Sequence, residues 1–580
     1  MKLNRKYIIL AFVAALSSFA IAQDNPEKEE EDRLNGGTIT VVKAYDPTIS
    51  DAFKVNSIPQ INDTTKVKKK PVTYRIFSVP VASTYTPITG GLDKLRPRER
   101  AKYFDNYARL GLGNYVNILG EFAGNFEIDR NSDFGVFLNH NSSQGGIDEV
   151  EAENGFSDTA LDLSYGARSR EMNWGVTGGG RYRTANWYGD FENTPNPLTE
   201  DSDVGLNYIN YGLGGRAEFF GKTFEKIEVK FSGISSGEDA SEFRIQARPE
   251  LMFDIMDTDA NIAAEVDYLS GSFGTQGIFP VPEDYSYLNT GLNPSINLYG
   301  DQYKAELGAR LNYIQDLENS EGEFKVYPDI NASYILVEDL LVGYTKIGGG
   351  LDLNSLAGFA DENLFLAPSI FIAPTDRQID AQLGIRGKLT SQFAYKVYGG
   401  YRIEENRNFY ITDTGFNPFN TSTEPEAWES GNVFYTRYAD LNTATAGAAL
   451  TFDNGNGLDI TLKGAYMSYD VENGDTFENV PSQLPEITAD LIAGYQINEK
   501  WNAGATLYFV GEREAFRIGS GVETLDGFVD LNLDVTYKIN PKLSAFLRGN
   551  NLTGGNYEFY SGYPVQSLQV LGGAVYKFDF

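Results

Sequence analysis

From Tyr103 onward, apolar and polar residues alternate at every second position, and this pattern limits the possible folds more than any other feature of the sequence. Between Phe528 and Ile539, apolar residues take the odd positions and polar residues take the even ones. The same alternation recurs in segments such as 303–313. A period of two is typical of a β-strand with one apolar and one polar face. The sequence therefore predicts an all-β fold.

The connections between the predicted strands fall into two classes of length. Some are tight turns, such as 130–133 and 540–542, whereas others are long, such as 188–204 and 413–431. Short turns at one end and long loops at the other are typical of transmembrane antiparallel β-barrels. Counting hairpins in this way predicts a barrel of about 22 strands over residues 103–580. Since the count is even, we expect both termini on the short-turn side, in the periplasm.

The N-terminus of the chain predicts export. Residues 1–22 combine a basic start, an apolar run and the small-residue site Ala20-Ile21-Ala22, which are the parts of a secretory signal peptide. No later window approaches the roughly 18 consecutive apolar residues of a transmembrane helix. Because only helices and closed barrels can span a bilayer, we expect a barrel in contact with lipid in the outer membrane of a Gram-negative bacterium.

Residues 23–102 form a predicted extended segment between the signal peptide and the barrel. Proline recurs through this segment and favours extended backbone. Its basic run, Lys66 to Lys70, has two interpretations. It is either a solvated linker or a contact with acidic groups in the barrel lumen or on a periplasmic partner.

Charge and cysteine content exclude several classes of function. The formal net charge of −32 argues against nucleic acid as a partner, because like charges repel. The absence of Cys removes disulfides, thiolate metal sites and cysteine nucleophiles. Ordinary turn chemistry explains the Asn/Asp/Gly-rich loops, so we expect neither a metal nor another cofactor.

The C-terminal segment carries a family resemblance. Residues 529–580 include the Arg548-Gly549-Asn550-Asn551-Leu552 stretch and an aromatic ending, Tyr576-Lys577-Phe578. This segment resembles the last three strands of TonB-dependent receptors. The resemblance implies a large outer-membrane barrel that handles a solute.

A second segment resembles the TonB box of the same family, which pairs as a strand with the energising periplasmic protein. It spans residues 38–44, with Gly37 where the family has an acidic residue. The resemblance assigns partner binding to Thr38, Ile39, Thr40, Val41 and Val42. Only residues 45–102 separate this segment from the barrel, and no part of them resembles the family's plug domain. A wide lumen must then be filled by the N-terminal segment, by inward-folded loops or by another protein.

Two loops are candidates for filling the lumen or binding a ligand. The stretch 364–374 is too apolar for open water, so we expect it inside the lumen or against a partner. Phe416, Phe419 and Trp428 lie in the 413–431 loop, where they could stack on a ligand such as a glycan or form a small core within the loop.

One strand carries a pair of residues typical of hydrolases. His140 and Ser142 share the apolar face of their strand, an arrangement similar to the His-x-Ser pair of outer-membrane phospholipase A. The neighbouring strand offers Ser157 and Thr159 rather than an acid or amide to orient the histidine. A polar interface cluster explains the pair better, so we expect no catalytic residues and no enzyme.

These observations lead to one expected function and one alternative. We expect an outer-membrane barrel that takes part in uptake or passage of a solute, with a TonB-type protein as a partner. The alternative is a scaffold barrel that transports nothing and binds other outer-membrane proteins in a complex.

Overall fold

The computed structural model of the chain describes residues 104–189, 191, 197–221, 223–255, 258–279, 281–338, 340–415, 426–472 and 479–579. The predicted signal peptide, the extended segment 23–102 and the segment 38–44 lie outside these residues. They therefore stay predictions.

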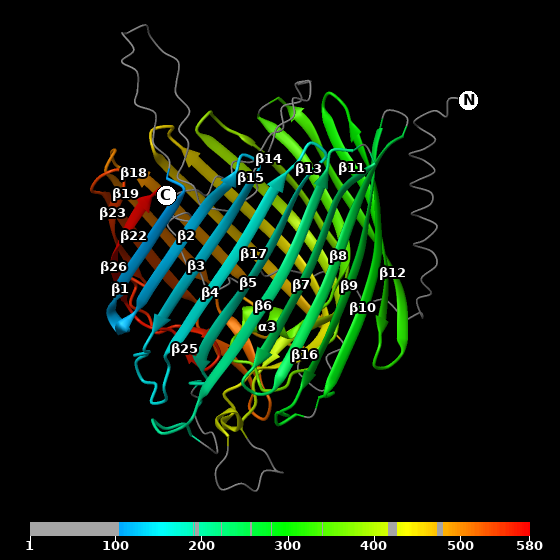
Figure 1. Cartoon of the computed structure of the whole chain (residues 1–580). Helices are drawn as coiled ribbons and strands as arrows, with labels where there is room; N and C mark the ends of the chain where they lie inside the picture. Colours follow the sequence, from blue (N-terminus) through cyan, green and yellow to red (C-terminus); the bar gives the residue numbers. More distant parts are fainter. Residues whose placement is uncertain are drawn as a thin grey trace.

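The described residues form one closed, antiparallel β-barrel of 22 strands, as the sequence predicts (Figure 1). The first strand, β1, pairs on one side with β2 and on the other with the last strand, β26. The register of the closing pair places Asn106 opposite Phe578, so the barrel begins and ends at the same edge. Because each barrel strand pairs with a neighbour on either side, the sheet has no open edge strand.

The barrel strands are β1 (Asn106–Gly113), β2 (Ile118–Asp129), β3 (Ser132–Ser143), β4 (Phe156–Arg168), β5 (Met172–Asn186), β6 (Gly205–Phe219), β7 (Phe224–Ser236), β8 (Ala240–Ile255), β9 (Thr258–Phe273), β10 (Asp284–Tyr299), β11 (Tyr303–Asp316), β12 (Glu321–Val337), β13 (Leu341–Asp352), β14 (Thr375–Lys388), β15 (Phe393–Ile411), β16 (Tyr435–Asp453), β17 (Leu458–Glu472), β18 (Ile487–Gln496), β19 (Trp501–Val510), β22 (Phe528–Lys538), β23 (Leu543–Asn550) and β26 (Gln569–Phe578). The smaller elements are η1 (Asn114–Val116), α3 (Leu356–Glu362), η2 (Ala427–Ser430) and the hairpins β20 (Arg513–Arg517) with β21 (Gly521–Leu525) and β24 (Glu558–Tyr560) with β25 (Tyr563–Pro564).

The two ends of the barrel differ in their connections. At the edge where β1 begins, ten connections of two to four residues join the strands, and we call this edge the short-turn end. At the opposite edge, the long-loop end, eight of the eleven connections have ten residues or more. Strand length also varies around the wall, from eight residues in β1 to nineteen in β15 and β16. About 9–11 residues are enough to cross a bilayer, so the long strands extend beyond it.

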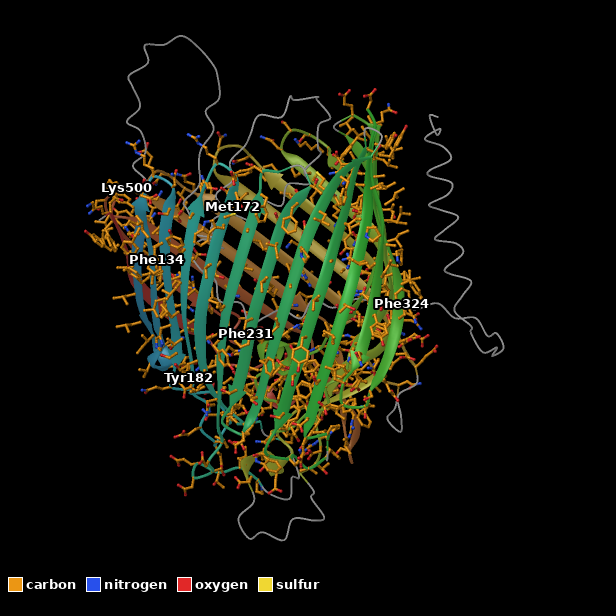
Figure 2. All side chains as sticks on the ribbon, turned by 45° about the vertical axis from the view of Figure 1, so that its right-hand side comes forward. Phe134, Met172, Tyr182, Phe231, Phe324 and Lys500 are labelled. Atoms are coloured by element: carbon orange, nitrogen blue, oxygen red, sulfur yellow. The ribbon has the colours of Figure 1, made fainter. Side chains whose placement is uncertain are left out.

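The outer surface of the barrel is apolar and carries aromatic side chains at two heights. Trp174 and Tyr182 project outward from β5, and Tyr303 and Tyr313 project outward from β11. In Figure 2, Phe134 lies nearer the short-turn end, and Tyr182 nearer the long-loop end. A separation of eight to ten residues in a tilted strand corresponds to about 20–25 Å, the height of an outer-membrane apolar band. Among the described residues, no helix is long and apolar enough to cross a membrane.

The closing seam of the barrel contains a buried ion pair on its inner side. Arg109 of β1 donates to Glu121 of β2 across 3.1 Å, and both side chains are 1% exposed. The guanidinium of Arg109 also lies 4.5 Å from the ring centroid of Phe546 on β23. Arg109 of β1 therefore contacts β2 on one side of the seam and β23 on the other.

Removing the charge of Glu121 should destabilise the barrel. In Glu121→Gln, the buried Arg109 loses its ion-pair partner, which costs about 3–5 kcal/mol of unfolding free energy. The midpoint of thermal or urea unfolding, followed by the mobility shift of folded barrel on unheated gels, measures the effect. Glu127→Gln on the exposed end of β2 is the matched control and should leave the midpoint unchanged. Equal midpoints for the two variants would contradict this role of the pair.

Candidate functional site: the lumen and its loop layer

Seven of the long loops fold inward and pack together across the lumen, and we call this set the loop layer. Its apolar core includes Leu366, Ile370, Phe434 and Tyr563, each at most 1% exposed. Figure 1 shows α3, which belongs to one of these loops, inside the barrel wall. The loop layer consists of the described parts of 144–155, 187–204, 274–283, 353–374, 412–434, 511–527 and 551–568.

The loop between β13 and β14, residues 353–374, contributes most to the loop layer. It begins with α3, whose N-cap Ser355 accepts a hydrogen bond from the Gly358 amide. The inward-facing Glu242 of β8 accepts two more amide hydrogen bonds from α3, from Leu356 at 2.6 Å and Ala357 at 3.1 Å. A carboxylate at a helix N-terminus satisfies amides that have no partner within the helix. The start of α3 is thereby fixed to the barrel wall.

The rest of this loop is held through its backbone carbonyls. Trp187 donates its indole N–H to the carbonyl of Leu366 at 3.1 Å, and Tyr208 donates to that of Leu364 at 3.2 Å. The apolar stretch 364–374 thus buries most of its side chains, with Phe371 39% exposed, while its polar backbone finds partners on Trp187 and on the wall residue Tyr208. The prediction that this stretch packs inside the lumen is confirmed.

Aromatic rings join the loops to one another. Tyr563 stacks on Phe365 with ring centroids 3.9 Å apart and meets Tyr188 edge-on at 4.9 Å. Tyr188 donates its hydroxyl hydrogen to the carbonyl of Pro564 at 3.1 Å. Burial raises the pKa of Tyr188 well above its usual range, so its hydroxyl stays a neutral donor. These contacts connect residues 187–204, 353–374 and 551–568.

The hairpin of β20 and β21 extends the loop layer over the side of β15. The Ile518 amide donates to the Thr412 carbonyl at 2.9 Å, and the Arg517 side chain donates to the Asp413 carbonyl at 2.8 Å. The guanidinium of Arg517 also lies over the ring of Phe191, 4.1 Å from its centroid. Burial lowers the pKa of Arg517 and raises the pKa of the Asp413 carboxyl.

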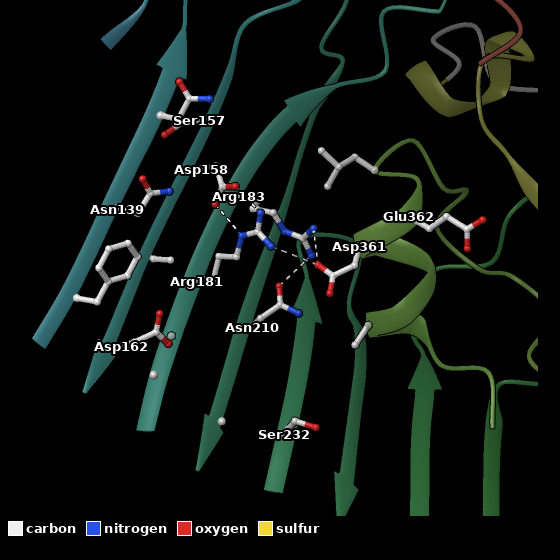
Figure 3. A pocket seen from close by; sticks show the side chains of 18 of the residues that line it. Asn139, Ser157, Asp158, Asp162, Arg181, Arg183, Asn210, Ser232, Asp361 and Glu362 are labelled. Atoms are coloured by element: carbon white, nitrogen blue, oxygen red, sulfur yellow. Dashed lines mark hydrogen bonds and ion pairs between the residues drawn. The ribbon is translucent and has the colours of Figure 1, made fainter. Parts of the chain in front are cut away.

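Two arginines of β5 connect the barrel wall to the end of α3 (Figure 3). Arg183, which is 4% exposed, lies 3.0 Å from the Asp361 carboxylate and donates to the Ala360 carbonyl at 3.0 Å. Arg181 pairs with Asp158 of β4 and approaches Asp361 at 3.4 Å. We call Arg181, Arg183, Asp158 and Asp361 the arginine latch. It fixes the lumenal side of α3 to the wall.

A large cavity lies inside the barrel beside the loop layer. Its volume is about 1840 Å³, and it follows the inner faces of strands on both sides of the seam. It reaches from Tyr563 in the loop layer to Asp133 and Arg168 near the short-turn end. Nine carboxylates and six basic side chains line it, among many apolar ones, so the charged groups of its wall carry a net negative charge.

Glycines provide much of the space in this cavity. Gly135, Gly179, Gly212 and Gly214 take inward positions on β3, β5 and β6. A Cβ on Gly179 would stand 2.5 Å from the Asp162 carboxylate, so a side chain there would displace a charged group. At these glycines no side chain projects from the wall into the cavity. The space between the charged residues is therefore open to an elongated molecule.

The predicted aromatic site is only partly described. Phe416 and Phe419 lie outside the described residues, so stacking on a ligand stays a prediction. Trp428 lies in η2, is 9% exposed and packs into the core of the loop layer.

His140 and Ser142 point to the outer face of β3, as their position in the sequence predicts. The His140 Nε2 atom lies 3.0 Å from the Ser142 hydroxyl, and its Nδ1 atom lies 2.8 Å from the Thr159 hydroxyl. A threonine hydroxyl cannot stabilise a charged imidazolium as a carboxylate does. The three side chains satisfy one another's hydrogen bonds at the barrel surface.

The arginine latch and Glu242 were not predicted from the sequence. The Arg181-Tyr182-Arg183 stretch gave one usable signal, because two arginines on the polar face of a strand must point into the lumen. Their partner Asp361 follows 178 residues after Arg183, in a loop whose path the sequence pattern does not define.

Comparison with known protein families and with curated proteins finds no match for the sequence. Solved structures do match the fold. The siderophore receptor PirA from Acinetobacter baumannii superimposes with a TM-score of 0.60 at 10% identity, covering 82% of this chain and 80% of that one. The ferric-catecholate import receptor Fiu from K12 E. coli gives 0.61 at 11% identity, covering 83% and 82%. The copper transporter OprC gives 0.58 at 11% identity, covering 82% of each chain.

The chain thus has a barrel like that of TonB-dependent receptors, as the C-terminal resemblance implies. Such a barrel and the apolar outer surface support an outer-membrane location. The matched proteins are transport receptors and not enzymes, which is consistent with the expectation that this chain is not an enzyme.

Breaking the arginine latch should loosen α3 without unfolding the barrel. Arg183→Met leaves the Ala360 carbonyl without its donor and leaves Asp361 with only the longer contact to Arg181, and we expect amide exchange in residues 356–362 to speed up about tenfold or more. Hydrogen exchange read by mass spectrometry measures this rate. Arg216→Met is the matched control, because Arg216 pairs with Glu218 and Glu228 on the wall and not with α3. Equal protection of α3 in both variants would show that the latch does not hold it.

Proposed function

We propose that this chain is an outer-membrane barrel that takes part in the uptake or passage of a solute. The observation that carries this proposal is the lumenal cavity of about 1840 Å³, which runs along the barrel wall from the loop layer toward the short-turn end. A cavity of this size whose lining includes charged side chains accommodates a hydrated solute. The matched structures include receptors named for siderophore and ferric-catecholate import and a copper transporter. Their fold supports a role in passage, and it does not identify the solute.

In this proposal the short-turn end faces the periplasm and the long loops face outward. Both ends of the barrel sequence then lie on the periplasmic side, since β1 begins and β26 ends at the short-turn end. The segment Thr38 to Val42 can reach a TonB-type protein there and pair with it as an added strand. A pull on this segment would supply the energy for passage.

A scaffold that transports nothing is the alternative, and the loop layer favours it. The core of that layer is tightly packed and its loops are hydrogen-bonded to the barrel wall, as in a permanent structure. Such a barrel would bind other outer-membrane proteins and leave its lumen closed.

Conductance in a planar bilayer tests whether the loop layer closes the lumen. We expect the intact barrel to conduct little, and a variant with residues 355–373 replaced by a short Gly-Ser linker to conduct strongly. The physical reason is that this loop carries much of the core of the layer. The mobility shift on unheated gels checks that the variant still forms a barrel. High conductance of the intact chain would contradict closure by the loops.

Deleting residues 37–45 distinguishes the two functions. If the chain is an energised transporter, the deletion abolishes energy-dependent uptake in cells while the barrel remains in the outer membrane. If it is a scaffold, the deletion leaves nutrient-dependent growth unchanged, and proteins that co-purify with the intact barrel are lost. Scrambling residues 47–55 instead is the control, because it alters the same N-terminal segment and keeps 37–45 intact.

A further inference from the structure

Three basic side chains gather on the inner face of β13, β14 and β15, toward the short-turn end, and we call them the cationic patch. They are Lys346, Arg386 and Lys396. Arg386 lies directly opposite Lys396 in the register of β14 and β15. The adjacent register pair, Ile385 and Val397, is exposed on the outer face, so the patch faces the lumen. This part of the wall does not line the cavity described above.

No carboxylate compensates the charge of the cationic patch. Among the described residues, no ion pair includes Lys346, Arg386 or Lys396. Asp380, which faces inward on β14, pairs instead with Arg402 at 2.7 Å. The charges that act on Lys396 are those of Lys346 and Arg386, which have the same sign. Because like charges directly opposite each other destabilise a sheet, the patch costs the barrel stability as long as no anion is bound to it.

Two tyrosine rings support the cationic patch without neutralising it. The Lys396 Nζ atom lies 4.8 Å from the ring centroid of Tyr398 and 5.4 Å from that of Tyr344. The guanidinium of Arg386 lies 5.2 Å from the Tyr344 centroid. The Tyr344 ring itself lies across Gly384, where a Cβ would stand 2.7 Å from the tyrosine hydroxyl oxygen. A ring face attracts a cation and carries no net charge, so the cluster is held in place and stays positive.

The nitrogen atoms of the cationic patch remain available to a ligand. Lys346 is exposed to the lumen, and Arg386 and Lys396 are half-buried. Among the described residues, the Arg386 Nε atom is buried and has no hydrogen-bond partner. A guanidinium matches the geometry of phosphate oxygens, and lysine ammonium groups act beside it as point charges. Three positive charges favour a ligand group with more than one negative charge, which describes a phosphate better than a carboxylate.

We propose that the cationic patch binds a phosphate-bearing solute inside the barrel, toward its short-turn end. Arg386 binds the phosphate oxygens, and Lys346 and Lys396 balance the remaining charge. The bound anion also removes the repulsion between Arg386 and Lys396. A solute and not a lipid headgroup supplies the phosphate, because the patch faces the lumen and not the bilayer. Binding at this site does not depend on whether the barrel is energised or transports a solute.

Titration of the purified full-length barrel with pyrophosphate tests the site. We expect isothermal titration calorimetry at low salt to show saturable binding that weakens as salt is raised, because salt screens the charges. Replacing Lys346, Arg386 and Lys396 together by Gln should lower the affinity about tenfold or more, since charge-assisted hydrogen bonds are lost. Pyrophosphate should also raise the thermal unfolding midpoint of the intact barrel and not that of the triple variant.

The matched control replaces Lys500, Lys538 and Lys542 by Gln, three exposed lysines at the short-turn end of β19, β22 and β23. It removes the same amount of charge and leaves the cationic patch intact, so its affinity for pyrophosphate should equal that of the intact chain. The mobility shift on unheated gels checks that both triple variants form barrels.

Four results would overturn the proposal. The first is no binding of pyrophosphate by the intact barrel, and the second is equal affinity in the two triple variants. The third is tighter binding of citrate than of pyrophosphate, which would assign the patch to polycarboxylates. The fourth is displacement of pyrophosphate by phosphatidic acid in the same detergent, because the ligand would then be a lipid headgroup.

Discussion

The requirement that governs this structure is that every backbone hydrogen bond of a membrane-spanning wall must be satisfied within the protein. Pairing β1 with β26 meets it by closing the sheet. Closure of 22 strands has a second consequence, because a barrel of this circumference encloses more space than the side chains of its own wall can fill. What fills the lumen is therefore the central physical question for this chain, and the described residues answer it in part with their own loops.

The wall and the loop layer use different interactions because their surroundings differ. Inside the wall, cross-strand pairs such as Arg244 with Asp267 and Arg402 with Asp380 balance charge locally. Charged side chains are tolerated there because water reaches them, and ion pairing reduces the repulsion between like charges on the inner surface. The loop layer is instead a small apolar core, stabilised by burial as in a soluble domain. The arginine latch and Glu242 lie where these two environments meet.

The alternation of residues, together with the lengths of the connections, was enough to predict the barrel, its strand number and which faces meet lipid. The period is local, and each strand such as β22 carries it within its own residues. The apolar character of 364–374 likewise predicted burial, since such a stretch is unfavourable in water. The path of each loop could not be predicted, because it depends on contacts between distant residues. Trp187 and Leu366 are 179 positions apart, and neither has a local pattern that points to the other.

The same loop contacts determine what any passage through the lumen would require. Residues 353–374 bury six large apolar side chains in the core of the layer, namely Leu353, Leu356, Phe359, Leu366, Ile370 and Ile372. Burial of each such side chain contributes about 1.5–3 kcal/mol, so thermal fluctuation alone rarely exposes them together. Opening therefore needs coupling to another source of free energy, either a ligand that binds the open arrangement better or a mechanical pull. A pull transmitted through the N-terminal segment enters the barrel beside β1, next to the cavity and on the side away from the loop layer. The solute path and the energy input would then meet in one cavity. Whatever occupies that cavity would therefore determine whether a solute can pass through the barrel.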